Sequence, residues 1–177
     1  QNKDNFEKLL AKKLNLIRVS APLMVLKDSM LNDELGIDKQ GIAFTSKALN
    51  QEVEIIQSLA KWKRMALYKY NFDNHTGLYT DMNAIRANDP IDNTHSLYVD
   101  QWDWEMVITP EQRTLHFLEQ TVRRIYAAIL RTEYLTCETY PEIKPFLPEK
   151  ITFVHSEDLL QMYPDKTPKE REDAICE

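Results

Sequence analysis

The run Tyr98–Glu105 concentrates polar side chains that could bind a ligand. Within eight positions it holds two of the three Trp of the chain, three carboxylates and one amide. Alternate positions form two sets, the first Asp100, Trp102 and Trp104 and the second Gln101, Asp103 and Glu105. An extended strand would place these sets on opposite faces. Acidic and amide groups sharing one face are costly in a core but suit a site that grips a polar ligand. The alternative is an exposed strand face whose Trp side chains point inward.

A second candidate group is cationic. Three Lys or Arg side chains lie within four positions, at Lys61, Lys63 and Arg64. Such a cluster is by default a solvated helix face. The functional alternative is a cationic recess for a carboxylate or a phosphate. Lys63 and Arg64 are then the better candidates, because Lys acts as a point charge and Arg binds oxyanions bidentately.

Two further residues could take part in chemistry. Arg86 ends an alternating segment just before a loop, where it could reach a phosphate lying across a sheet or be an ordinary strand-end residue. Asp33 lies in the polar run Asn32-Asp33-Glu34 and would by itself be interpreted as a solvated loop residue. The histidines show no spacing typical of a metal site, so packing or helix capping is expected for His95 and His155.

Composition limits the classes of function. A net charge of −6, from 22 basic and 28 acidic residues, argues against a general nucleic-acid or anionic-membrane binder but allows a local basic pocket. No apolar run is long enough for a membrane span. Three Gly in the chain exclude glycine-rich phosphate loops from this portion. Cys137 and Cys176 are expected to be reduced cytosolic thiols, with a single disulfide as the alternative.

Hydrophobic periodicity predicts the elements that must position these residues. Helices are expected over 5–14, 57–70, 111–139 and 157–162 and from Thr167 onward, with Thr109 and Ser156 as caps of the third and fourth. Strands are expected over 17–26, 42–44, 53–56, 78–85, 95–107 and 151–154. Pro22 should keep its strand at an edge or a boundary. Segments 78–85 and 95–107 should pair antiparallel. The order predicts an α+β fold, an antiparallel sheet flanked by helices.

Three blocks of this sequence resemble the ammonia-dependent asparagine synthetase (aspartate–ammonia ligase) family. They are Gln57–Arg64, Gly77–Arg86 and His95–Glu105, and the match extends through 145–148, 153–157 and Tyr163-Pro164. The family has the class II aminoacyl-tRNA synthetase catalytic fold and works as a homodimer. The resemblance therefore implies that residues 1–177 are the N-terminal portion of a single synthetase-like catalytic domain whose C-terminal half is absent. The chain has no start Met and no capping or turn residues at its last positions, so both ends are expected to be points where a longer chain is truncated.

The resemblance also assigns two motifs. The helix over 6–14 and the strand through Pro22 look like the family's first motif, which builds the dimer interface. The hairpin over 78–107 looks like the second motif, and Arg86 matches its arginine. The implied reaction is cytoplasmic synthesis of asparagine from aspartate, ammonia and ATP through a β-aspartyl-adenylate, with release of AMP and pyrophosphate.

The resemblance implies roles for individual residues. Arg86 would stabilise the charge that gathers on the α-phosphate, with Mg²⁺ on the ATP phosphates and no metal ligand in this portion. Lys63 would pair with the α-carboxylate of aspartate, Gln101 and Asp103 would hold its polar groups, and Ser58 would also bind substrate. Asp33 would help to orient the incoming ammonia. Neither a nucleic acid nor a membrane is an expected partner.

Two departures from the family pattern accompany the match. The family usually has glycines in the loop before the Asp33 position, whereas Lys27–Asp33 has none here, and Gln57 stands where a His is expected. These changes, together with the missing half, leave a second hypothesis, a catalytically inactive synthetase-like module used for dimerisation or regulation. A true aminoacyl-tRNA synthetase core is disfavoured, because the chain lacks a tRNA-binding domain and a basic charge balance.

Overall fold

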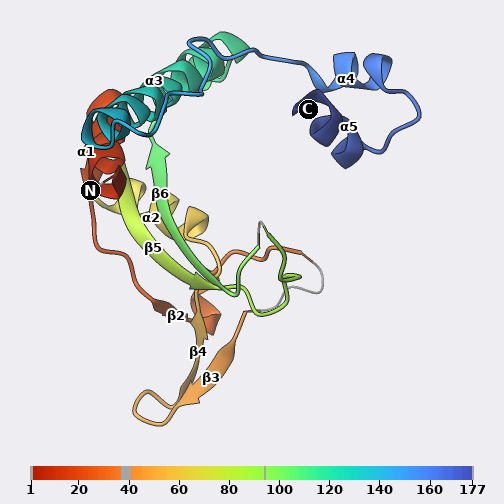
Figure 1. Cartoon of the computed structure of the whole chain (residues 1–177). Coiled ribbons are helices and arrows are strands. Elements are labelled where there is room, and N and C mark those ends of the chain that lie inside the picture. Colours follow the sequence, from red (N-terminus) through yellow and green to blue (C-terminus); the bar gives the residue numbers. More distant parts are fainter. Residues whose placement is uncertain (1, 37–40, 94, 177) are drawn as a thin grey trace. The chain divides into compact units, whose positions relative to one another are not determined.

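The computed structural model describes residues 2–36, 41–93 and 95–176, which form two compact units, 1–145 and 146–177. The first unit is built around a three-stranded sheet in the order β1-β5-β6, formed by β1 (Leu16–Arg18), β5 (Gly77–Ile85) and β6 (Tyr98–Met106). β5 and β6 pair antiparallel along their whole length, from Gly77 opposite Met106 to Ile85 opposite Tyr98 (Figure 1). The predicted hairpin is therefore confirmed, and β1 adds one parallel strand at its edge.

A second sheet lies beside the first and has the order β2-β4-β3. It consists of β2 (Met24–Leu26), β4 (Gln51–Ile55) and β3 (Ala43–Ser46), all antiparallel. The single strand predicted over 17–26 is wrong, because its two ends belong to different sheets as β1 and β2. Pro22 lies between them, where its missing N–H costs no ladder bond. Both strands are edge strands, as expected for a segment carrying a proline.

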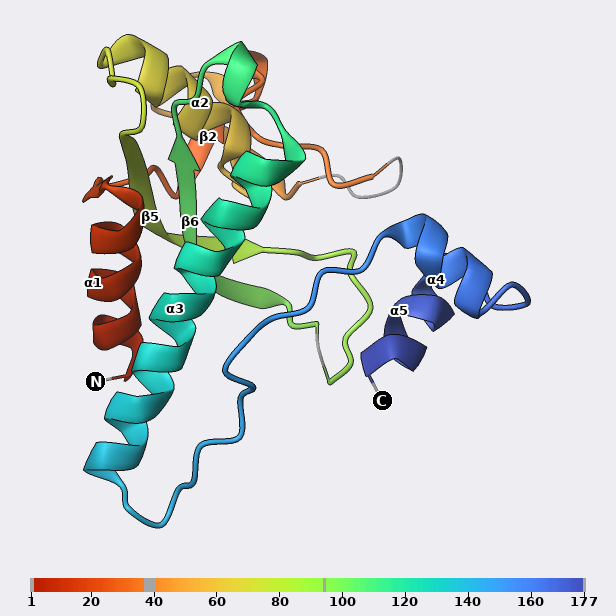
Figure 2. The same cartoon turned by 90° about the horizontal axis from the view of Figure 1, so that it is seen from above.

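Helices cover both faces of the hairpin. α1 (Asn2–Leu14) and α3 (Leu115–Thr139) pack against each other on one face (Figure 2). There Leu10 and Leu14 form a buried cluster with Tyr79 of β5. α2 (Ala60–Lys69) packs on the other face, and its Ala66 and Leu67 contact Leu78. The same face continues into a cluster that joins β2 to β5, made of Val25, Ile56, Leu59, Met82 and Ala84. The predicted helix–sheet–helix arrangement is confirmed.

Helix starts differ from the prediction by a few residues. The helix expected from residue 111 begins at Leu115, because Thr109 caps a separate 3-10 turn, η2 (Pro110–Gln112). Thr114 caps α3 itself, its hydroxyl oxygen accepting from the Phe117 N–H at 3.2 Å. At the first helix, Asn15 follows the last turn with φ 55°, the left-handed conformation typical of a helix end. A further 3-10 turn, η1 (Lys27–Ser29), begins the loop that carries Asp33.

The second unit contains α4 (Ser156–Met162) and α5 (Pro168–Cys176), which pack against each other. The strand predicted over 151–154 is wrong: a strand requires a neighbouring ladder, and neither sheet of the described chain includes this segment. Ser156 is the first helical residue rather than the cap. His155 supplies the cap, its Nδ1 accepting from the Glu157 N–H at 3.3 Å. The predicted start at Thr167 is confirmed, since Glu170 accepts from its N–H and its hydroxyl.

Gly77 is predicted to tolerate no side chain. An added Cβ would lie 2.3 Å from the Glu105 carbonyl oxygen and 2.8 Å from Leu16 Cδ2, so the three strands would have to separate. In the full-length protein, Gly77→Ala should lower the free energy of unfolding by about 2 kcal/mol or more, as overpacked sites do. Urea titration measures this. Gly41→Ala is the matched control, because its Cβ would meet the side-chain amides of Asn32 and Gln57 at 3.0 and 3.3 Å and would stay 3.5 Å from the nearest backbone atom, the Ile55 carbonyl oxygen. Equal effects of the two substitutions would contradict the prediction.

The alkaline limit of stability should depend on Tyr79. Burial, followed by the hydrogen bond that its hydroxyl donates to Glu7 at 2.7 Å, raises the pKa of Tyr79 to about 12. The unfolded chain would lose this proton near pH 10, so between about 10 and 12 it binds fewer protons than the folded chain. The free energy of unfolding should therefore fall as pH rises through this window. Tyr79→Phe should flatten that fall in urea titrations from pH 8 to 11.5; an unchanged slope would refute the assignment.

Candidate active site

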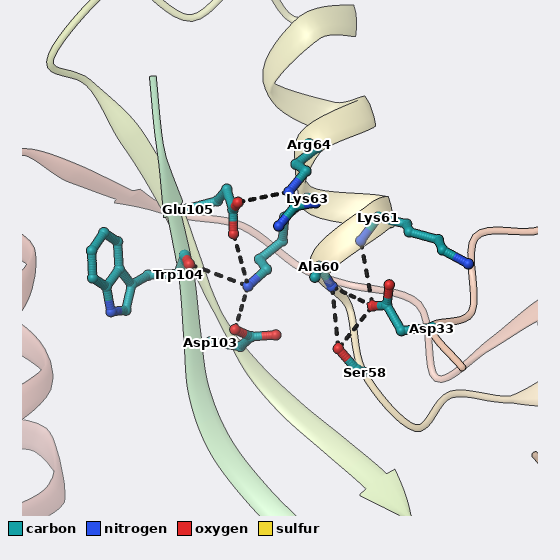
Figure 3. Close-up of polar contacts among 9 residues, drawn as sticks. All are labelled: Asp33, Ser58, Ala60, Lys61, Lys63, Arg64, Asp103, Trp104 and Glu105. Atoms are coloured by element: carbon teal, nitrogen blue, oxygen red, sulfur yellow. Dashed lines mark hydrogen bonds and ion pairs between the residues drawn. The ribbon is translucent and has the colours of Figure 1, made fainter. Parts of the chain in front are cut away.

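A buried lysine joins α2 to β6. The Lys63 side chain is only 2% exposed, and its ammonium contacts the Asp103 carboxylate, the Trp104 carbonyl oxygen at 3.2 Å and Glu105 Oε2 at 3.6 Å (Figure 3). An ammonium has three donors, and here three acceptors surround it. A buried charge is strongly destabilising unless it is paired in this way. The interpretation of this helix segment as a solvated cationic face is therefore wrong for Lys63.

The carboxylates that contact Lys63 share one face of β6, because side chains alternate between the two faces of a strand. In the hairpin register, Gln101, Asp103 and Glu105 lie opposite Met82, Thr80 and Leu78. Asp103 and Glu105 contact Lys63 of α2, so this set faces α2. The other set faces α1: the Trp102 ring lies 5.2 Å from Phe6, and Asp100 pairs with Lys3. The predicted two-faced strand is confirmed. Gln101 itself is exposed.

Asp33 lies at the N-terminus of α2. Its Oδ2 accepts from the Ser58 hydroxyl at 2.8 Å, from the Ala60 N–H at 2.8 Å and from the Lys61 N–H at 3.4 Å (Figure 3). The first N–H groups of a helix lack internal partners, and a carboxylate here also meets the positive end of the helix dipole. Asp33 is thus an anchored residue, and the solvated-loop interpretation is wrong. Its second oxygen takes no part in these contacts.

Asn32 is a residue that the sequence analysis missed. It is 8% exposed, its Oδ1 accepts from the Gln57 N–H at 2.9 Å, and its Nδ2 donates to the Ile55 carbonyl at 3.1 Å. It therefore ties the Asp33 loop to the end of β4. In the sequence, Asn32 is only a polar residue next to Asp33. That position alone does not distinguish a buried side chain that holds two segments together from a solvated loop residue. Gln57 is itself buried at this junction.

Arg86 follows the last residue of β5. Its N–H donates to the Leu97 carbonyl at 2.9 Å, which closes the hairpin end. Its Nε is buried and has no hydrogen-bond partner among the described residues. Such an unsatisfied buried donor calls for an explanation, and a missing anionic ligand is one. The structure thus brings Lys63, Asp103 and Glu105 together, holds Asp33 and Ser58 together at the start of α2, and places Arg86 at the far end of β5.

The surroundings of Lys63 include a second ion pair and a cavity. Arg64 Nε donates to Glu105 Oε1 at 2.9 Å, and this hydrogen bond raises the pKa of Arg64. A cavity of about 470 Å³ opens beside this pair, lined by Arg64, Leu67, Phe72, Glu105, Val107 and their neighbours. No three His, Cys, Asp or Glu side chains gather as a possible metal site in the described parts of the chain.

The fold is that of class II aminoacyl-tRNA synthetases. The crystal structure of pyrrolysyl-tRNA synthetase from Desulfitobacterium hafniense matches 72% of this chain and 45% of its own with a TM-score of 0.54. A second structure of the enzyme from that organism gives 0.51. The identities are 15% and 16%, so this likeness shows the fold alone.

The chain belongs to the aspartate–ammonia ligase family, whose model matches residues 1–177. Proteins named aspartate–ammonia ligase are 55% identical over 98% of this chain in Parabacteroides distasonis and 54% identical over 98% in Clostridium perfringens. The matches cover 50% and 52% of those proteins, so the chain spans about half the length of its curated relatives. The family resemblance is confirmed. None of the helices in the described residues combines the length and apolar character that crossing a membrane requires.

The anchoring role of Asp33 can be measured as stability. Asp33→Ala removes three hydrogen bonds from the start of α2 and should lower the free energy of unfolding by about 1–2 kcal/mol, as the loss of a helix cap does. Asp33→Asn keeps an acceptor and should cost less. Asp28→Ala, in the exposed η1 turn of the same loop, is the control and should change little. Urea unfolding of the full-length protein gives the values. A loss in Asp28→Ala equal to that in Asp33→Ala would contradict the assignment.

Proposed function

We propose that the full-length protein containing this chain makes asparagine from aspartate, ammonia and ATP through a β-aspartyl-adenylate, releasing AMP and pyrophosphate. Membership of the aspartate–ammonia ligase family supports this activity. The observation that carries the proposal is the buried contact between Lys63 and Asp103, on the face of β6 that also carries Gln101. This contact holds one positive and one negative group side by side.

That pair matches the charged groups of an amino acid. The α-carboxylate of aspartate would form an ion pair with the Lys63 ammonium. The α-ammonium of aspartate would pair with the Asp103 oxygen that does not contact Lys63. The exposed amide of Gln101 would form hydrogen bonds with the same two substrate groups. Ser58 would bind substrate from the start of α2. Each ionic hydrogen bond of this kind is about twice as strong as a neutral one. The side-chain carboxylate of aspartate would then be left free for activation.

Activation would occur at the α-phosphate of ATP. A side-chain carboxylate oxygen of aspartate attacks the α-phosphorus, and the bond to the bridging oxygen breaks, releasing pyrophosphate. Negative charge grows on the α-phosphate oxygens in this transition state, and a fixed guanidinium stabilises it. Arg86, whose buried Nε is unsatisfied among the described residues, would supply that charge. Mg²⁺, bound when ATP is present, would neutralise its phosphates.

Ammonia would complete the reaction. Its nitrogen attacks the acyl carbon of the adenylate, AMP leaves with the bonding electrons, and the new amide loses a proton. The oxygen of Asp33 that does not cap α2 would accept a hydrogen bond from the incoming nitrogen and so orient it. The cap contacts would hold that carboxylate still, which favours a defined approach.

Assembly and location follow the family. We propose a homodimer that uses α1 and the segment from β1 to β2, where Ile17 is 61% and Leu23 is 54% exposed. Large apolar side chains exposed together often mark an interface. A cytoplasmic enzyme without a nucleic-acid or membrane partner agrees with the net charge of −6.

Arg86→Ala should abolish adenylation. The full-length wild-type protein is expected to form AMP and asparagine in equal amounts, and the variant should lose aspartate-dependent pyrophosphate release by 100-fold or more, on the order of a lost transition-state charge. Arg131→Ala, an exposed Arg of α3, is the matched control and should retain the rate. Unchanged pyrophosphate release in Arg86→Ala would refute the role of Arg86. A wild-type protein that forms dimers but no asparagine would instead support the inactive module.

A further inference from the structure

Glu105 lies at the centre of the charged cluster, and the proposed reaction assigns it no role. Its two carboxylate oxygens have different partners: Oε1 accepts from Arg64 Nε at 2.9 Å, and Oε2 lies 3.6 Å from Lys63 Nζ (Figure 3). The side chain is 25% exposed, against 68% for Arg64 and 2% for Lys63. Glu105 therefore connects an outer cation to a buried one.

We propose that Glu105 is a positioning residue for aspartate binding, which holds the Lys63 ammonium in place when Asp103 engages the substrate. This inference rests on the proposed function. It concerns the one carboxylate on the α2-facing side of β6 that would contact neither substrate nor phosphate.

The charge balance of the cluster supports this role. Lys63 and Arg64 carry two positive charges, and Asp103 and Glu105 carry two negative ones, so the four cancel. In the free protein Asp103 contacts Lys63 directly. When the α-ammonium of aspartate arrives, Asp103 must share its charge between two cations. Lys63 is too deeply buried to recover hydration. The α-carboxylate of aspartate would pair with it from the substrate side, and Glu105 would keep it paired from the protein side.

The geometry gives Glu105 the fixed position that this role requires. Arg64 and Lys63 are neighbours on α2, and Glu105 bonds the first while facing the second. Leu78 lies opposite Glu105 in the ladder and is fully buried, which fixes the backbone at this point. Without the Glu105 charge, Asp103 would be the only carboxylate of the protein beside Lys63. Its attraction to Lys63 would then compete with its attraction to the substrate ammonium.

Glu105→Gln tests this role in the full-length enzyme, because it keeps the shape and removes the charge. The KM for aspartate should rise 10- to 100-fold, on the order expected when a positioning group is lost, while the KM for ATP stays within about twofold. Glu105→Asp keeps the charge on a shorter arm and should give an intermediate KM for aspartate. Asp100→Asn is the matched control: it removes a carboxylate from the same strand that pairs with Lys3 on the opposite face. It should leave the KM for aspartate within about twofold.

Arg64→Gln separates positioning from simple bracing. It breaks the hydrogen bond that links α2 to β6 through Glu105 but leaves the Glu105 charge beside Lys63. It should lower the melting temperature about as much as Glu105→Gln and raise the KM for aspartate much less. Equal KM values in the two variants would overturn the inference in favour of a structural brace. So would an unchanged KM for aspartate in Glu105→Gln. A wild-type enzyme that makes no asparagine would overturn the proposed function itself, and this inference with it.

Discussion

The burial of one ammonium group is the constraint on which the organisation of this unit depends. Lys63 lies on α2 with the buried residues Ala66 and Leu67, and yet carries a charge. Removing its partners would leave an uncompensated buried charge, which costs several kcal/mol. The acceptors must therefore come from β6, and β6 must keep its register on β5. A slip by one residue would turn Asp103 and Glu105 away and present Trp102 and Trp104 to α2.

The two faces of β6 consequently perform different tasks. Toward α1 and α3, Trp104 packs with Leu10 and Tyr79, and the Trp102 ring contacts Phe6 in a tilted arrangement. Toward α2, the same strand carries the ionic cluster. The packing energy of the apolar face fixes the strand on which the polar face is built. This arrangement lets a polar site be preorganised by hydrophobic contacts that never touch a ligand.

The hairpin, the alternation of β6 and most of the helices could be predicted because each follows from local periodicity. Three features could not. Lys63 has the same sequence neighbourhood as a surface lysine, and only the approach of β6 across 40 positions makes it buried. The cap of α2 comes from Asp33, 27 residues before Ala60, so no local capping pattern indicates it. The residues on both sides of Pro22 have β-propensity that suits one continuous strand. They form two strands instead, because β1 pairs with β5 in one sheet and β2 pairs with β4 in the other.

The loop before Asp33 combines a residue in the left-handed conformation with hydrogen bonds that hold the end of the loop. Met30 follows the η1 turn with φ 54°, the left-handed region that glycine adopts freely and that costs other residues roughly 1 kcal/mol. A glycine-free loop thus keeps the conformation for which glycines are suited, at some cost in stability. The compensation lies just downstream, where Asn32 clamps the loop to Gln57 and Ile55 and Asp33 bonds the start of α2. These bonds are made by residues that follow Met30 in the sequence. The backbone strain is therefore confined to the turn at Met30, and the Asp33 carboxylate stays fixed. The position of the carboxylate therefore depends on the hydrogen bonds of Asn32 and on its own bonds to the start of α2.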